Sequence, residues 1–318
     1  MNEPLQPGLP ERQFPHPLQH RIFFAPNGLL RPIWRVVFFI IVAPVVTFAG
    51  LYGLKALVAV VPAFGTEAFH IGSTISRLVF NTVLLLVTAL FTRVFDRRGY
   101  HTLGLWFYPG WAKEAALGVL CGAGVIAAVI GGMVAARGAV YHGWGEAIHL
   151  WGQFGGTAVY VLLAAASEEI VFRGYAFQRL LDSIGRLGAI LVLSALFGAA
   201  HLNNPGQPTA ISAANTALAG VLLAVAYLKT RGLWLPLGLH WAWNFFLGPV
   251  FGLPVSGFTL TFQPYLFNAE VSGPAWLTGA NYGPEGSILL TGVCVVAIVW
   301  LWRSRRISPS PAMAEVLK

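Results

Sequence analysis

The strongest constraint on the fold is a series of apolar runs long enough to cross a lipid bilayer. A helix needs about 20 residues to span about 30 Å of hydrocarbon, and about eight runs approach this length. They cover roughly residues 35–60, 74–95, 112–136, 156–181, 187–201, 209–228, 233–250 and 286–302. Because a backbone inside lipid must satisfy its own hydrogen bonds, we expect an all-α integral membrane protein with about eight transmembrane helices.

Composition and charge agree with this expectation and suggest a location. The chain is 56% hydrophobic, 10% charged, and has a mean hydropathy of +0.68. Residues 1–30 have no apolar core of a cleavable signal, so the first helix is expected to direct insertion. If the N-terminus is inside, most of the 20 Lys and Arg residues fall on the cytoplasmic side. We therefore expect a multi-pass protein of the cell membrane, of the bacterial inner-membrane type, with both termini cytoplasmic. The net charge of +8 then reflects topology and contacts with anionic lipids, and no nucleic-acid partner is expected.

Five segments are expected along the chain. They are a cytoplasmic tail at 1–30, helices 1–3 with an outer loop at 31–155, a core at 156–250, an outer loop at 251–285, and a last helix with a basic tail at 286–318. Cys121 and Cys294 lie singly in apolar helices and are predicted to be packing residues. Gly118 and Gly122 are four apart, which is typical of close helix packing.

Three ionisable residues interrupt the apolar run from about 156 to 180. Glu168, Glu169 and Arg173 each cost about 2.5 to 3.5 kcal/mol to place in a membrane helix, so the cluster predicts a functional site. Its candidate partners also lie in apolar segments, and they are His201, His240 and Asn244. Together they predict a polar catalytic cavity within the bundle.

Helical spacing assigns possible roles within this set. Glu169 and Arg173 are four apart and are spaced for an ion pair, whereas Glu168 lies about 100° further around the helix. An unpaired carboxylate in a low-dielectric cavity suits a general base that activates water. His240 and Asn244 are also four apart, and their donors suit a developing oxyanion. The Glu169–Arg173 pair is equally consistent with a purely structural role.

The depths of these residues agree only in part. At about 1.5 Å per residue, Glu168 lies about 16 Å from the helix end near Arg179, and His240 lies about 14 Å from Arg231. His201 lies about 22 Å from Arg186. The fifth helix must therefore tilt, or begin deeper, for His201 to reach the others.

The ordered motifs resemble those of a known family. Glu168-Glu169-x-x-x-Arg173, Phe197-x-x-x-His201 and His240-x-x-x-Asn244 are similar to the three motifs of the CPBP intramembrane proteases. That family includes type II CaaX prenyl endopeptidases and bacteriocin-immunity-like relatives of the Abi group. The resemblance covers roughly residues 156–250. It implies that Glu168 and His201 act on one water, that His240 and Asn244 form the oxyanion site, and that Glu169 and Arg173 support them. The implied substrate is a membrane-associated protein or lipidated peptide, such as a prenylated CaaX-type C-terminus, and membrane lipids are the other expected contacts.

A metal-dependent version of the reaction stays open. Glu168, His201 and His240 would make a three-ligand zinc site with a position for water. The chain has no His-Glu-x-x-His helix, and Asn244 is a poor zinc ligand. The residues favour a metal-free glutamate mechanism, with zinc or another divalent metal as the alternative.

Two other classes of function compete with the endopeptidase. A non-catalytic membrane immunity or scaffold protein would keep the fold and tolerate Glu168→Gln. A proton-coupled transporter also uses Glu and His chains, but we find no inverted repeat of the kind such transporters show.

Overall fold

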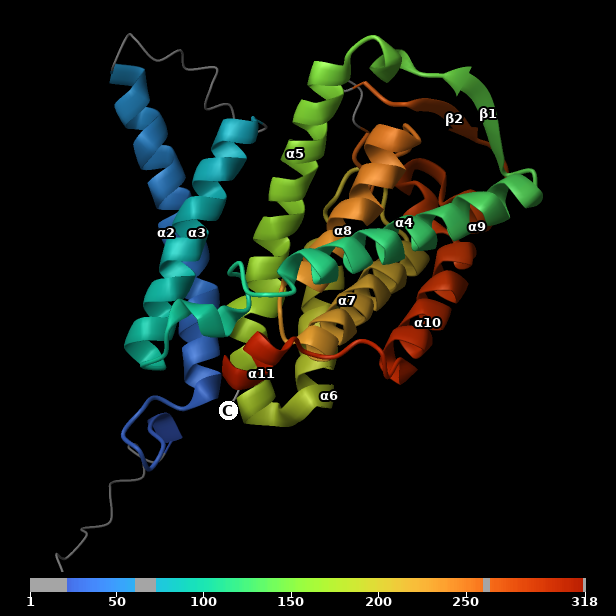
Figure 1. Cartoon of the computed structure of the whole chain (residues 1–318). Helices are drawn as coiled ribbons and strands as arrows, with labels where there is room; N and C mark the ends of the chain where they lie inside the picture. Colours follow the sequence, from blue (N-terminus) through green and yellow to red (C-terminus); the bar gives the residue numbers. More distant parts are fainter. Residues whose placement is uncertain (1–21, 61–72, 260–263, 317–318) are drawn as a thin grey trace, which may run out of the picture.

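The computed structural model describes residues 22–60, 73–259 and 264–316 as a helical bundle (Figure 1). Most of the predicted N-terminal tail, residues 1–21, lies outside the described residues, as do 61–72, 260–263 and 317–318. The longer helices are α2 (Pro32–Val60), α3 (Thr74–Phe95), α4 (Trp111–Ala135), α5 (Trp151–Glu169), α6 (Tyr175–Ala200), α7 (Ala210–Thr230), α8 (Trp234–Phe245) and α10 (Ile288–Arg303). The short helices are α9 (Ala275–Thr278) and α11 (Pro311–Val316). Short 3₁₀ turns are η2 (Tyr100–Leu103), η3 (Glu146–Ile148), η6 (Ala280–Tyr282) and η7 (Pro284–Gly286).

Several of these helices are long and apolar enough to cross a membrane, as the sequence predicts. Five candidate spans occur among the described residues: Pro32–Val60, Thr74–Phe95, Trp111–Ala135, Trp151–Ala200 and Ala210–Thr230. The predicted number of eight is not confirmed. The seventh and eighth predicted segments correspond to α8, with 12 residues, and α10, with 16 residues. The fourth and fifth segments follow each other directly within Trp151–Ala200, a stretch of 50 residues in which Gly185 is not helical and separates two helical parts.

This 50-residue stretch reverses direction at Gly185. Gly185 has a φ of 74° and a ψ of 179°, a backbone conformation that glycine adopts readily. In a straight helix, Glu168 and His201 would lie about 50 Å apart, yet their side chains are 3.9 Å apart. The two residues lie at nearly equal distances along the chain from Gly185, about 25 Å on either side of the turn. Glu168 and His201 therefore lie at the same depth. The sequence estimate differed because it measured the depth of Glu168 from Arg179, whereas the helix continues to Gly185.

Helices α4 and α8 cross in close contact (Figure 1). Gly118 and Gly122 provide the contact surface on α4, as their spacing predicts. A Cβ atom at Gly118 would overlap the carbonyl oxygen of Leu235, and one at Gly122 would overlap that of Leu239. The close approach fixes the position of α8, the helix that carries His240 and Asn244.

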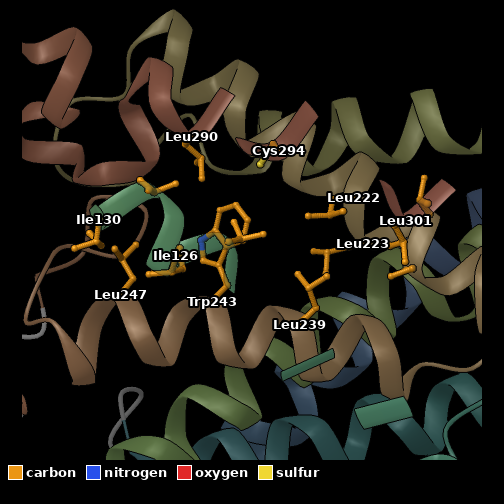
Figure 2. Close-up of a cluster of buried hydrophobic side chains, with 14 of the residues drawn as sticks. Ile126, Ile130, Leu222, Leu223, Leu239, Trp243, Leu247, Leu290, Cys294 and Leu301 are labelled. Carbon is orange, nitrogen blue, oxygen red and sulfur yellow. The ribbon is translucent and has the colours of Figure 1, made fainter. Parts of the chain in front are cut away.

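A hydrophobic cluster fills the space between α4, α7, α8 and α10 (Figure 2). Trp243 of α8 lies in this cluster with Ile126, Leu223 and Leu290. Cys294 is completely buried there, and Cys121 packs against it, so both cysteines are packing residues as predicted. A second cluster joins α2, α3 and α6.

The described residues are not purely helical. Strands β1 (Ala139–Trp144) and β2 (Phe267–Val271) pair antiparallel, with Ala139 opposite Val271. They come from the two segments for which the sequence predicts outer loops: β1 from the end of segment 31–155, and β2 from segment 251–285. The bundle is helical as expected, and this strand pair is an addition that the sequence analysis did not predict: each strand supplies the backbone hydrogen bonds that the other lacks.

Candidate active site

Glu169 lies at the centre of a buried polar network. Its Oε1 atom accepts a hydrogen bond from Nη1 of Arg173 at 3.0 Å, which is the ion pair that the four-residue spacing predicts. The same oxygen lies 2.7 Å from Nδ1 of His240. Glu169 and Arg173 are 1% and 2% exposed, so the charges neutralise each other away from water. Arg173 also donates to the carbonyl oxygen of Gly220 and lies over the ring of Phe197.

Glu168 points into the adjacent cavity, towards the imidazoles of His201 and His240. Its Oε2 atom lies 3.7 Å from Nε2 of His240 and 3.9 Å from Nε2 of His201. These distances exceed a direct hydrogen bond and leave space for a bridging water. The Glu168 side chain is 36% exposed, whereas that of Glu169 is 1% exposed. The neighbouring acids thus occupy the two different environments that helical geometry predicts.

In each histidine, a contact made by Nδ1 orients the ring. Nδ1 of His201 lies 2.7 Å from the carbonyl oxygen of Phe197, to which it can only donate. Nδ1 of His240 faces the carboxylate of Glu169. In both rings Nε2 is therefore the atom directed at Glu168. Such a partner on the far nitrogen fixes the ring position and the tautomer.

A π-helical turn lies within the first motif, and another lies just after the third motif. The π-helical turn η4 (Ile170–Gly174) follows Glu169 and contains Arg173. The π-helical turn η5 (Phe246–Val250) follows shortly after Asn244 and contains Pro249. Such turns re-aim side chains relative to a regular α-helix and are frequent at functional sites.

A cavity of about 430 Å³ connects these residues. Glu168, His201, His240 and Asn244 line it, and Phe197 forms part of its wall. Asn244 lies on the same face of α8 as His240, as their spacing predicts. All six predicted site residues thus lie either in the cavity wall or in the network directly behind it.

Glu285 is a second acid in the wall of this cavity, beside Glu168, and it was not among the predicted site residues. It lies in η7, is 7% exposed, and lines the cavity. Its Oε1 accepts a hydrogen bond from Nε1 of Trp243 at 2.9 Å, and its Oε2 accepts one from the backbone N–H of Ser256. Burial raises the pKa of the Glu285 carboxyl. An acid in a loop rich in glycine and proline gives no periodic signal, so only the folded loop reveals its position.

The zinc alternative does not fit the side chains as they lie. Zinc requires ligand atoms about 2.0 to 2.2 Å from one point. Among the described residues, no group of three or more His, Cys, Asp or Glu side chains is placed to hold a metal ion.

A comparison with protein families finds a similarity over the segment that carries this site. The family model described as "Type II CAAX prenyl endopeptidase Rce1-like" matches residues 150–246. This segment contains α5, α6, α7 and α8, and with them every motif residue. The resemblance to the CPBP proteases is therefore confirmed over this segment, and it supports an intramembrane endopeptidase at the level of the family. No curated protein and no solved structure matches the chain.

Proposed function

We propose that the chain is an intramembrane endopeptidase in which Glu168 activates the attacking water. The observation that supports the proposal is the convergence of three polar atoms: Nε2 of His240 and Nε2 of His201 lie 3.7 and 3.9 Å from Oε2 of Glu168. We infer that the attacking water binds between them. The position of Glu168, partly exposed within a membrane-embedded cavity, suits a base that takes a proton and returns it.

The proposed reaction is hydrolysis of a peptide bond. Glu168 takes a proton from the water, which His201 helps to position, and the hydroxide attacks the carbonyl carbon. The carbonyl π electrons move to oxygen, and the side chains of His240 and Asn244 donate hydrogen bonds to that oxyanion. His240 donates from Nε2 as an imidazolium, a form that the Glu169 carboxylate on Nδ1 stabilises. The C–N bond then breaks as the proton held by Glu168 passes to the leaving amine.

The proposed substrate is a membrane-associated protein or a lipidated peptide of the CaaX type. The matching family description supports this class, and the many exposed apolar side chains of the helices support a reaction inside a bilayer. We further propose that both termini face the cytoplasm of a bacterial cell. The distribution of Lys and Arg supports this orientation, and α11 lies at the same end of the bundle as the start of α2 (Figure 1).

Substitution of Glu168 by glutamine tests the proposal. The purified protein in detergent is incubated with prenylated and unmodified C-terminal peptides, and the products are analysed by mass spectrometry. We expect Glu168→Gln to lower cleavage by about 10² to 10⁴ because glutamine cannot act as a base. Size-exclusion chromatography and thermal unfolding should show an intact fold.

Glu270→Gln is the matched control, because Glu270 lies exposed on β2 and does not line the cavity. It should retain full cleavage. Turnover by Glu168→Gln at the native rate would refute the role of Glu168. Cleavage by neither the native chain nor any variant would favour a non-catalytic membrane protein.

A further inference from the structure

Arg77 is a basic residue in the wall of the active-site cavity, in the first turn of α3. Its Nη2 atom is 3.4 Å from the hydroxyl of Tyr160, and its guanidinium lies 5.4 Å from the centre of the Tyr160 ring. Its Nε atom is buried and has no hydrogen-bond partner among the described residues. The guanidinium is therefore only partly satisfied by the protein.

Other arginines inside the bundle are paired with acids. Arg35 and Arg179 both contact Asp96, and Arg173 contacts Glu169. Arg77 has no carboxylate within ion-pair distance among the residues that the structure describes. Because an unneutralised charge at low dielectric is costly, the cavity is suited to a ligand that brings a negative charge to Arg77.

One face of α5 forms the cavity wall between Arg77 and Glu168. Tyr160, Ala164 and Glu168 are spaced four residues apart, lie on one face of the helix, and all line the cavity. Ala164 is small and leaves the space between the two ends open. Eight residues of helix rise about 12 Å, which is the axial separation of Tyr160 from Glu168.

This separation corresponds to a short extended peptide. An extended chain covers about 3.3 to 3.6 Å per residue, so about 12 Å corresponds to three or four residues. The carboxylate that ends a polypeptide chain is an anion at a fixed distance from each upstream peptide bond. It forms strong, charge-assisted hydrogen bonds with a guanidinium.

We propose that Arg77, together with the hydroxyl of Tyr160, binds the C-terminal carboxylate of the substrate while the bond three or four residues upstream lies at Glu168. The proposal rests on the proposed endopeptidase function and adds a residue that selects free C-termini. Glu285 lines the same cavity, but among the described residues it forms no ion pair with Arg77; its two side-chain oxygens contact Trp243 and Ser256 instead. Arg77 is the one Lys or Arg among the described residues that line this cavity.

The test compares a farnesylated peptide that ends in a free carboxylate with the same peptide carrying a C-terminal amide. We expect the native chain to prefer the acid by about 10- to 100-fold in kcat/KM, the range for hydrogen bonds to charged groups. Arg77→Gln should reduce the rate for the acid to that for the amide, and Arg77→Lys should retain part of the preference. Arg137→Gln removes an exposed arginine outside the cavity and should leave the preference unchanged.

Binding measurements separate this proposal from the proposed function. Fluorescently labelled acid and amide peptides are titrated into Glu168→Gln, with and without Arg77→Gln, and followed by anisotropy. Tighter binding of the acid that depends on Arg77 supports the subsite even if no peptide is cleaved. Equal binding of acid and amide, or an equal loss of both in Arg77→Gln, overturns it. An effect of Arg77→Gln that follows anionic lipid content and not the peptide terminus would assign Arg77 to headgroup contacts and would also overturn it.

Discussion

At the scale of single residues, one oxygen atom joins the two halves of the site. Oε1 of Glu169 contacts both Arg173 on its own helical stretch and His240 on α8. Glu169 therefore sets the charge balance behind the cavity and the orientation of the imidazole that faces Glu168. A residue with two such contacts affects stability and geometry together.

Glu169→Ala is predicted to destabilise the protein strongly. The substitution leaves the Arg173 guanidinium, which is 2% exposed, without its carboxylate, and breaking a buried pair costs about 3 to 5 kcal/mol. Unfolding in detergent measures the loss. The double variant Glu169→Ala/Arg173→Met should recover part of it, because the uncompensated charge is gone. A fully stable but inactive Glu169→Ala would instead mean that Glu169 acts directly on the substrate or the water.

At the scale of elements, helix packing and helix breaks determine where the motif side chains point. Within one helix, a four-residue spacing places two side chains on one face whatever the rest of the fold does. The position of α8 depends on α4, whose glycines allow the backbone of α8 to approach. The π-helical turns after Glu169 and near Asn244 then set the final directions.

Gly122→Ala is predicted to disturb the site from outside the cavity. The new Cβ would overlap the Leu239 carbonyl oxygen, one residue before His240, and overpacking of this kind costs about 1 to 3 kcal/mol. We expect lower thermal stability and a lower cleavage rate. Gly124→Ala on the same helix is the matched control, since a Cβ there meets nothing within 4 Å. It should be neutral, or stabilising by up to about 1 kcal/mol through helix propensity. Equal effects of the two substitutions would contradict the close-packing interpretation.

At the scale of the whole molecule, the cavity is completed by a segment outside the matched family region. The chain between η5 and α10 forms β2, pairs with β1, and returns to the bundle at Glu285. The side chain of Asn215 on α7 holds this return by donating to the carbonyl oxygens of Glu285 and Ser287. Segment 251–285 is thus part of the cavity wall.

Through Glu285, the folding stability of the protein is expected to depend on pH. Burial raises its pKa in the folded protein above the ordinary value of 4.5, so the folded state favours the protonated acid. Its contribution to stability is fully present below pH 4.5 and is lost as the pH rises through the raised pKa. We therefore expect the melting temperature of the native chain, relative to Glu285→Gln, to fall as the pH increases over this range. Glu270→Gln controls for the loss of one exposed carboxylate. A constant difference between native and Glu285→Gln, or one of opposite sign, would contradict the assignment.

The sequence by itself determined the membrane setting and the local pairs. Apolar run length reflects the cost of placing polar groups in lipid, and the pairing of Glu169 with Arg173 follows from the helical repeat. The length of an apolar run and the spacing of an ion pair are both set by residues close together in the sequence. Tertiary structure alone decided how many helices have full spanning length, and that His201 lies level with Glu168. That alignment depends on the position of the turn at Gly185. The fold also decided that Arg77 and Glu285 face the same cavity as Glu168, because such placement depends on the packing of segments far apart in sequence, which no local period encodes.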